Sequence, residues 1–331
     1  MIRLGSETVE GSGSRTADLV LEGGGVKGIG LVGAVVELAA QGWRFPRVAG
    51  TSAGAIVGSL VAAYQAAGCD LGDLAARMET LDYTRFRDRG LLARLGWPGK
   101  TAELLIHNGI YRGEYLLRWL AAELDAVGVR TFGDLRITDD PDADLLPHQC
   151  YRLVVVASDI SRGQLVRLPW DYHYYGLDPD RQRIVDAVHA SAAIPLFFRP
   201  ITLRCGPDGG GDVTLVDGAL LSNFPVEIFD RTDGRPARWP TFGVKLSARP
   251  RSRQVSHPID GPVDLAMASL RTLLAAHDAY HLDDERITAR TIFVDTMRVS
   301  PVDFDVDPAT ERLLYEKGRS AARRFLADRD T

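Results

Sequence analysis

Apolar and polar positions alternate along the first 70 residues with the periods of strands and helices. The run DLVL at 18–21 predicts a buried strand, which the glycines at 23–25 end. Apolar side chains then recur at helical spacing over 29–41, a second short strand is expected within 45–50, and Ser52 opens a second helix. This order of strand, glycine loop, helix, strand, turn and helix predicts a parallel α/β sheet.

The rest of the chain continues this pattern with one interruption. Residues 70–130 are more charged and predict a helical insertion, with a mobile cap over a site as the sharper alternative. We expect a polar leader over 1–16 and a single domain over 17–331, because no break in composition divides the chain. Further elements are expected as a central strand at 151–160, a hairpin turn at 207–212, strands at 242–247 and 291–295, and amphipathic helices at 262–290 and 308–328.

Composition and charge narrow the class of protein. The 331 residues are 45% hydrophobic and carry a net charge of −5, which argues against a general nucleic-acid binder. Three scattered cysteines without a CxxC pair favour free thiols in a reducing cytosol: Cys69, Cys150 and Cys205. The longest uncharged run, 53–69, is too short to span a bilayer and predicts a buried core helix. We therefore expect a cytoplasmic protein without a transmembrane anchor, and docking at a membrane surface stays open.

The second helix begins in a sequence that can carry chemistry. Gly50, Ser52 and Gly54 form a G-x-S-x-G pattern between a strand and a helix, which is typical of a nucleophile elbow. Such a turn projects one hydroxyl outward, and small neighbours let a reacting carbonyl approach it. The same pattern also occurs at helix N-caps and ordinary turns, so other segments decide between these interpretations.

A glycine loop precedes the first helix and has two interpretations. Gly23, Gly25 and Gly28 match the dinucleotide-binding pattern G-x-G-x-x-G, which makes a nucleotide-binding protein the alternative hypothesis. That pattern requires an acidic residue at the end of the second strand, and none is present there. The amides of Gly23, Gly24 and Gly25 instead suit an oxyanion hole, with Gly24 and Gly25 as the best donors. Lys27 either supports this loop or is a solvated helix lysine.

An aspartate late in the chain is the second candidate for chemistry. Asp217 and Gly218 follow the strand-like run VTLV, and Asp-Gly is a favoured turn pair. Taken alone, an ordinary turn is the better interpretation, but the serine elbow and the glycine loop elsewhere in the chain make Asp217 a candidate for chemistry.

Three motifs in this order resemble the patatin-like phospholipase family: EGGGVKG at 22–28, GTSAG at 50–54 and DGA at 217–219. ASAAIPLFF at 190–198 and DGALLSNFPV at 217–226 are also similar, so the resemblance covers about 17 to 248. The family usually has aspartate in place of Glu22 and often has asparagine in place of Phe224.

The resemblance implies a three-layer α/β/α fold with a mostly parallel central sheet. It also implies a Ser52–Asp217 dyad without histidine, which hydrolyses acyl esters of lipids without calcium. Its site then consists of the oxyanion hole at Gly23, Gly24 and Gly25, with Lys27, Gly28, Gly50, Gly54 and Gly218 in support.

The chemistry of such a dyad depends on the aspartate. A free aspartate has a pKa of about 3.9 and is a weak base at neutral pH, but partial burial raises that pKa. A Ser–acid–His triad is the alternative, because His257, His277 and His281 follow Asp217. The pair at 277 and 281 has the spacing of a metal pair but lacks the glutamate of HExxH. His189 precedes the family-like segment, and its spacing does not make it a base.

The resemblance implies a lipid or ester substrate, and its acyl chain requires an apolar cleft. Candidates for the lining, with plain core as the alternative, are Leu196, Phe197, Phe198 and Phe224. Candidates for contacts with lipids at an interface are Tyr111, Arg112 and Trp119. We expect no cofactor, no metal and no nucleic-acid partner, and a non-catalytic lipid-binding member of the fold is the third hypothesis.

Overall fold

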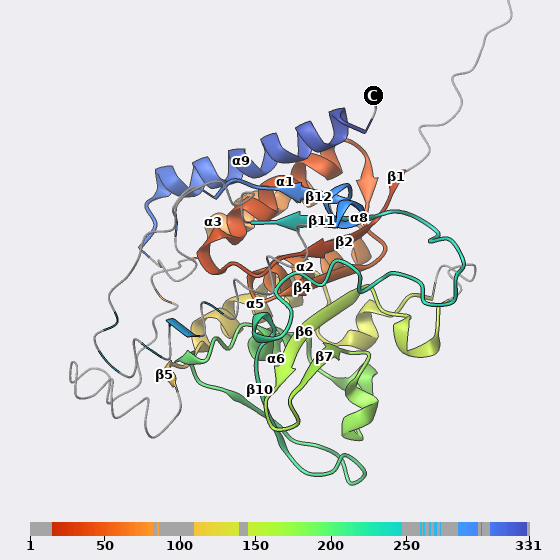
Figure 1. Ribbon diagram of the computed structural model, residues 1–331, viewed down its shortest axis with the longest axis vertical. Coiled ribbons are helices and arrows are strands. Elements are labelled where there is room, and N and C mark those ends of the chain that lie inside the picture. Colours follow the sequence, from red (N-terminus) through yellow and green to blue (C-terminus); the bar gives the residue numbers. More distant parts are fainter. Residues whose placement is uncertain are drawn as a thin grey trace, which may run out of the picture.

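The protein is built around one eight-stranded sheet (Figure 1). The computed structural model describes residues 15–81, 85, 109–138, 145–246, 284–296 and 305–329, together with a few single positions between 259 and 299. The strands of the main sheet are β2 (Asp18–Leu21), β4 (Val48–Thr51), β6 (Leu153–Asp159), β7 (Gln164–Leu168), β9 (Ile201–Leu203), β10 (Val213–Asp217), β11 (Thr241–Lys245) and β12 (Thr291–Phe293). Their order is β12-β11-β2-β4-β6-β10-β9, and β7 also pairs with β6.

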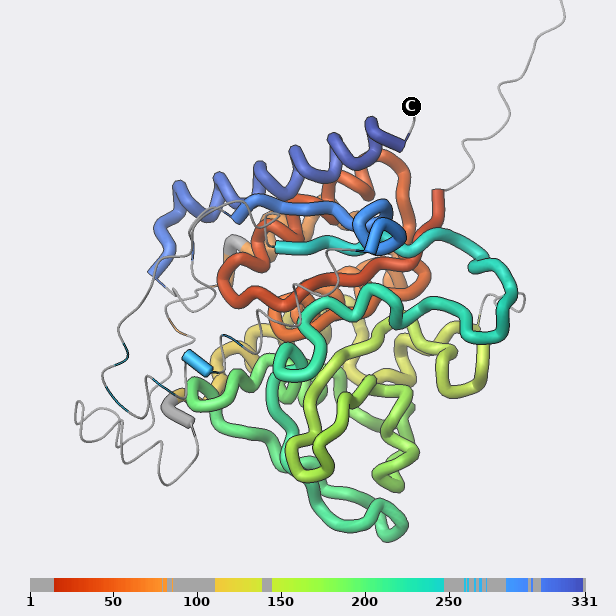
Figure 2. The backbone as a smooth tube through the Cα atoms, viewed as in Figure 1, coloured from red at the N-terminus to blue at the C-terminus, as the bar shows by residue number. Residues whose placement is uncertain are grey.

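Helices lie on both sides of this mostly parallel sheet, as the smoothed backbone also shows (Figure 2). The α-helices are α1 (Ile29–Ala40), α2 (Ala53–Ala66), α3 (Leu74–Glu79), α5 (Glu114–Ala126), α6 (Ile184–Ser191), α8 (Glu285–Thr288) and α9 (Pro308–Ala327). Short strands pair in parallel outside the main sheet, β1 (Arg15–Thr16) with β3 (Trp43–Arg44) and β5 (Gly109–Tyr111) with β8 (Leu196–Phe198). The 3₁₀ turns are η1 (Gly25–Gly28), η2 (Leu71–Asp73), η5 (Phe132–Leu135), η7 (Pro147–Gln149), η8 (Tyr172–Tyr175), η9 (Pro179–Arg181) and η10 (Gly218–Leu220).

The central strands are buried along their whole length. Every residue of β2, β4, β6 and β11 is buried. Strands that are covered on both faces consist of continuous apolar runs rather than alternating ones, because neither face meets water. This explains why DLVL and LVVVA predict strands although they show no period of two.

The central strand β6 holds two other strands end to end along one edge. β4 pairs in parallel with residues 153–156, whereas β10 pairs antiparallel with residues 157–159. β7 pairs with residues 155–159 and so overlaps both, which places it on the opposite edge of β6. β4 and β10 therefore run toward each other along one edge, and their carboxyl ends meet there. This geometry brings the residue after Thr51 close to Asp217.

The C-terminal helix α9 packs tightly along α1. A Cβ added at Gly33 would overlap the carbonyl of Tyr315, and one at Gly318 would overlap the carbonyl of Gly30, so the two backbones touch. The buried Glu37 of α1 accepts hydrogen bonds from two arginines of α9, at 3.0 and 2.9 Å. The C-terminal segment, in which the sequence shows no family motif, thus holds the helix that follows the glycine loop.

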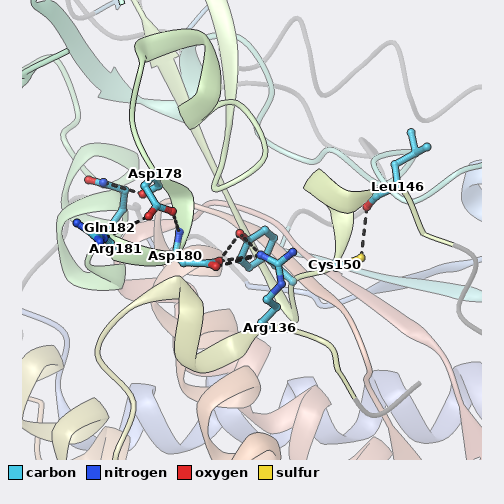
Figure 3. A network of polar contacts seen from close by, with 8 residues as sticks. Arg136, Leu146, Cys150, Asp178, Asp180, Arg181 and Gln182 are labelled. Carbon is cyan, nitrogen blue, oxygen red and sulfur yellow. Dashed lines mark hydrogen bonds and ion pairs between the residues drawn. The ribbon is translucent and has the colours of Figure 1, made fainter. Parts of the chain in front are cut away.

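A polar network fixes the chain just before β6 (Figure 3). The buried Tyr151 donates its hydroxyl to Asp180, and Arg136 Nη1 lies 3.1 Å from the Tyr151 oxygen and 3.0 Å from the Asp180 carboxylate. Burial, followed by the hydrogen bond to Asp180, raises the pKa of Tyr151 well above its ordinary value. The thiol of Cys150 donates to the Leu146 carbonyl at 3.4 Å. All three cysteines are free thiols.

Most of the predicted elements are confirmed. The strands predicted at 18–21, 151–160, 242–247 and 291–295 are β2, β6, β11 and β12, and the helices predicted from 29 and 308 are α1 and α9. The turn at 207–212 joins β9 to β10. Of the predicted leader, Arg15 and Thr16 form β1, and residues 1–14 lie outside the described part. The helix predicted at 262–290 lies mostly outside it too, apart from α8.

Candidate active site

Ser52 stands on a sharp turn between β4 and α2. Its φ of 52° and ψ of −119° form a conformation that L-residues rarely adopt. A Cβ added at Gly50 would overlap the backbone of Gly54, and one at Gly54 would overlap the carbonyl of Leu21. Only glycine therefore lets α2 begin so close to the ends of β4 and β2, which is the physical reason for the G-x-S-x-G spacing.

Asp217 is the last residue of β10 and lies near Ser52, where the carboxyl ends of β4 and β10 meet along β6. Its side chain lies beside the Ser52 side chain and accepts a hydrogen bond from the Ala219 N–H at 2.8 Å. Burial raises the pKa of Asp217 to about 7, and the Ala219 N–H and the Ser52 side chain oppose that rise. A Cβ added at Gly218 would overlap the carbonyl of Val156, so this turn also requires glycine. The structure thus brings the two predicted dyad residues together.

The glycine loop lies directly beside Ser52. A Cβ added at Gly23 would lie 3.2 Å from the Ser52 Cβ. The Gly23 N–H already donates to the Asn223 carbonyl at 3.1 Å, so the expectation that it points into an oxyanion hole is wrong. In the described part of the chain, the amides of Gly24 and Gly25 donate to no protein acceptor. Gly25 has a φ of 55°, a left-handed conformation that glycine adopts without strain.

The other supporting residues differ in what they contact. Gly28 lies against the first turn of α2, since a Cβ added there would be 3.2 Å from the Ala53 Cβ. Lys27 is half-buried on η1. Gly28 therefore leaves room for the helix that follows Ser52, whereas the supporting role of Lys27 stays a prediction.

A buried charged cluster lies behind the glycine loop. Glu22 accepts hydrogen bonds from Lys245 Nζ, from the Leu246 N–H and, at 3.3 Å, from Asn223 Nδ2. Glu22 and Lys245 are only 2% and 1% exposed, and the Lys245 ammonium lies 5.1 Å from the centre of the Phe224 ring. The sequence contains one signal for this cluster that our prediction missed, a single lysine inside the apolar run FGVKLS.

An apolar pocket opens beside Ser52. Nearly all of the residues around it are apolar or glycine, so it suits a hydrocarbon chain. They are Gly25, Gly28, Ser52, Ala53, Ile56, Val57, Met78, Leu81, Gly113, Leu116, His189, Ala192, Ile194 and Phe198.

The predicted lining residues are only partly confirmed. Phe198 lines the pocket, but Leu196, Phe197 and Phe224 do not. Phe224 is 2% exposed and belongs to the core beneath the glycine loop. The position of an apolar residue next to a motif in the sequence therefore does not show whether its side chain faces the pocket or the core. Met78 and Leu116, from α3 and α5, line the pocket instead, which places part of the 70–130 segment over the site.

The predicted lipid-contact residues lie in different environments. Tyr111 is only 7% exposed and lies 5.9 Å from Phe197 between ring centres, so its expected contact with an interface is wrong. Arg112 is exposed, and its side chain pairs with Glu114. The indole of Trp119 donates to Thr80 at 3.1 Å. Arg112 alone among the three keeps the exposure that such a contact needs.

The histidine alternatives lie only partly within the described residues. His189 lines the pocket, and its Nε2 lies 3.2 Å from the Arg112 carbonyl. His257, His277 and His281 lie outside the described residues. Within the described ranges, no three histidine, cysteine or acidic side chains form a group that could hold a metal ion.

Fold and site together define an α/β protein in which a serine turn, an aspartate and a glycine loop meet at one edge of a mostly parallel sheet. The chain belongs to the patatin-like phospholipase family, whose model matches residues 19–230. The predicted resemblance is therefore confirmed. Membership supports a lipid hydrolase activity in general, with a lipid or ester as substrate.

Two proteins to which this chain is similar cover most of its length. The chain is 36% identical to "Uncharacterized protein YqhO" of Bacillus subtilis (strain 168) over 313 residues, which cover 93% of this chain and 97% of that one. The structure of VipD from Legionella pneumophila matches 94% of this chain and 67% of its own, with a TM-score of 0.52 and 20% identity.

A second solved structure shares the fold. The full-length SpcU–ExoU complex from Pseudomonas aeruginosa matches 96% of this chain with a TM-score of 0.51 and 19% identity. This chain spans only 53% of the matched chain in that complex. Among the helices that the structure describes, none has the length and apolar character needed to cross a membrane.

Proposed function

We propose that the protein is a serine acyl hydrolase that cleaves carboxylic esters of lipids, of the phospholipase A, lysophospholipase or esterase type. The observation that carries the proposal is that Ser52, which lines an apolar pocket, and Asp217 lie side by side where the carboxyl ends of β4 and β10 meet. A serine hydroxyl needs a neighbouring base before it becomes a useful nucleophile. A carboxyl with a pKa of about 7 suits that task near neutral pH.

The proposed reaction has two halves. Ser52 Oγ attacks the ester carbonyl carbon while Asp217 takes the proton of the Ser52 hydroxyl. The ester C–O bond then breaks, and the departing alcohol takes this proton from Asp217. Water then attacks the acyl-enzyme, gives one proton to Asp217, and frees the fatty acid. The proton returns to Ser52, so the enzyme is unchanged at the end.

Backbone amides are the proposed donors to the oxyanion that forms in each half. Gly24 and Gly25 lie on the loop beside Ser52, and their N–H groups make no bond within the described chain. Ala53 is the first residue of α2, where a helix leaves its N–H groups without internal partners. A helix N-terminus also favours negative charge. These three amides support an oxyanion hole in which Ala53 replaces the predicted Gly23.

Hydrolysis of a chromogenic medium-chain ester tests the proposal. We expect Ser52→Ala and Asp217→Asn to lower kcat by more than about 1,000-fold, because each removes a group on which the reacting atoms depend. Ser59→Ala is the matched control, since Ser59 is a fully buried serine of α2 whose hydroxyl, among the described residues, bonds to the Ile56 carbonyl of its own helix. Full activity in Ser52→Ala would refute the assignment.

A labelling experiment separates catalysis from lipid binding. A fluorophosphonate probe should label wild-type Ser52 and react far more slowly with Asp217→Asn. Absence of labelling in a protein that still binds phosphatidylcholine vesicles would contradict the proposal and favour the non-catalytic lipid-binding hypothesis.

A further inference from the structure

The last rung between β4 and β6 is not a direct hydrogen bond. The Val48 N–H donates to the Arg152 carbonyl at 2.8 Å, which sets the register of this parallel pair. In a parallel ladder, every second residue donates to the same neighbour. Four residues further along, the same register places the Ser52 N–H opposite the Val156 carbonyl. The Ser52 N–H donates to another group instead, the Ser191 hydroxyl.

The Ser191 hydroxyl bridges this interrupted rung. Ser52 N lies 2.9 Å from Ser191 Oγ, and Ser191 Oγ donates to the Val156 carbonyl at 2.6 Å. Ser191 is fully buried at the end of α6, so water does not compete for these bonds. Hydrogen bonds linked in this way strengthen one another in a low-dielectric interior. One hydroxyl thus sets the spacing between the serine turn and β6.

The segment 191–193, which contains Ser191, also bonds to the backbone of Asp217. The Asp217 N–H donates to the Ala193 carbonyl at 2.9 Å. Ser191 and Ala193 are two residues apart, so one turn bonds to the backbones of both Ser52 and Asp217. Neither bond involves the reacting oxygens, and the Ser52 N–H is committed to Ser191 rather than to an oxyanion.

We propose that Ser191 is a positioning residue for the acyl transfer, whose hydroxyl fixes the backbone of the nucleophile where β4 separates from β6. This inference rests on the proposed function of Ser52. The turn at Ser52 is held in an unfavourable conformation, and such conformations persist only when the surroundings fix them. Without the bridge, the Ser52 N–H and the Val156 carbonyl either stay unpaired or close onto each other. Either result moves Ser52 Oγ relative to Asp217.

The test compares two buried serines that differ in what they hold. We expect Ser191→Ala to lower kcat by about 100-fold with KM within about twofold, because a misplacement near 1 Å costs that much while the acyl pocket is unchanged. Ser59→Ala also removes a fully buried hydroxyl, and its kcat should stay within about twofold of wild type. The pH midpoint of the remaining Ser191→Ala activity should match that of wild type, since the base is intact.

The possible results separate the role of Ser191 from the proposed function of Ser52. Circular dichroism selects a temperature at which both variants are folded. If Ser191→Ala does not fold, Ser191→Cys carries the same test, because its thiol fills the site but is a weak donor and acceptor. Equal kcat in the Ser191 and Ser59 variants, or a change in KM alone, overturns this inference while Ser52→Ala is still inactive. An active Ser52→Ala overturns the proposed function itself.

Discussion

Two buried carboxylates lie near the carboxyl ends of β2 and β10, and their surroundings differ. Glu22 is 2% exposed and pairs with the Lys245 ammonium, which is itself buried. Asp217 is 3% exposed, accepts a hydrogen bond from the Ala219 N–H and lies beside the Ser52 side chain, with no ion pair in the described part of the chain. Burial alone therefore does not distinguish a structural acid from a reactive one.

The presence of a cation determines what each carboxylate can do. Desolvation penalises the charged form of any buried acid, and a nearby opposite charge compensates that penalty. At Asp217 the compensation comes only from neutral donors, and its pKa rises to about 7. Glu22 is held in an ion pair behind the glycine loop, whereas the lack of a cation beside Asp217 in the described part of the chain suits the proton exchange with Ser52 that we propose.

Replacing each carboxylate by its amide should give the largest contrast. Asp217→Asn removes the proposed base and should lower kcat by more than about 1,000-fold, whereas its free energy of unfolding near pH 8 should not fall, because no buried charge loses a partner. Ester hydrolysis and urea denaturation of the same preparation measure both quantities. A large loss of stability in this variant would show that Asp217 is instead a structural acid.

Glu22→Gln should have the opposite effect. It leaves the buried Lys245 ammonium without its counter-charge, so we expect a loss of about 3–5 kcal/mol in the free energy of unfolding. The double variant Glu22→Gln/Lys245→Met removes both charges and should recover most of that loss. If the double variant is as unstable as Glu22→Gln, the ion pair does not explain the role of Glu22.

The pH dependence should separate activity from stability. Because the folded pKa of Asp217 lies above its unfolded value of about 3.9, the folded state holds this proton longer, and its contribution to stability falls as pH rises from about 4 to 7. From about pH 5 to pH 8, wild type should lose a few kcal/mol, about 2–3, relative to Asp217→Asn. Over the same window kcat/KM should rise with a midpoint near 7, as Asp217 ionises.

Urea denaturation of wild type and Asp217→Asn across this range measures the first effect, and initial rates measure the second. Parallel stability curves for the two proteins would contradict the raised pKa. A rate that falls through the window would contradict the role of Asp217 as a base.

Local patterns in the sequence predict the parts of the site that lie along one segment. The G-x-S-x-G turn and the strands β2, β4 and β6 follow from glycine spacing and continuous apolar runs. The meeting of β4 with β10 depends on the register of β6, which is a long-range property that no local pattern contains. The roles of Gly23 and Ser191 could not be predicted, because each depends on a hydrogen-bond partner far away in the chain: Asn223 for Gly23, and Ser52 and Val156 for Ser191.

Replacing Asn223, the neutral hydrogen-bond partner of Glu22, should have a smaller effect on stability. Asn223 Nδ2 donates to Glu22 at 3.3 Å, which is long for a hydrogen bond, while the main-chain carbonyl of Asn223 holds the Gly23 N–H. Asn223→Ala removes the side-chain amide and keeps the main-chain bond to Gly23, so we expect a loss of about 1–2 kcal/mol in the free energy of unfolding and a change in kcat of only a few-fold. Urea denaturation beside Glu22→Gln provides the comparison. A loss as large as that of Glu22→Gln would mean that the amide, rather than the Lys245 ammonium, is the main partner of this carboxylate.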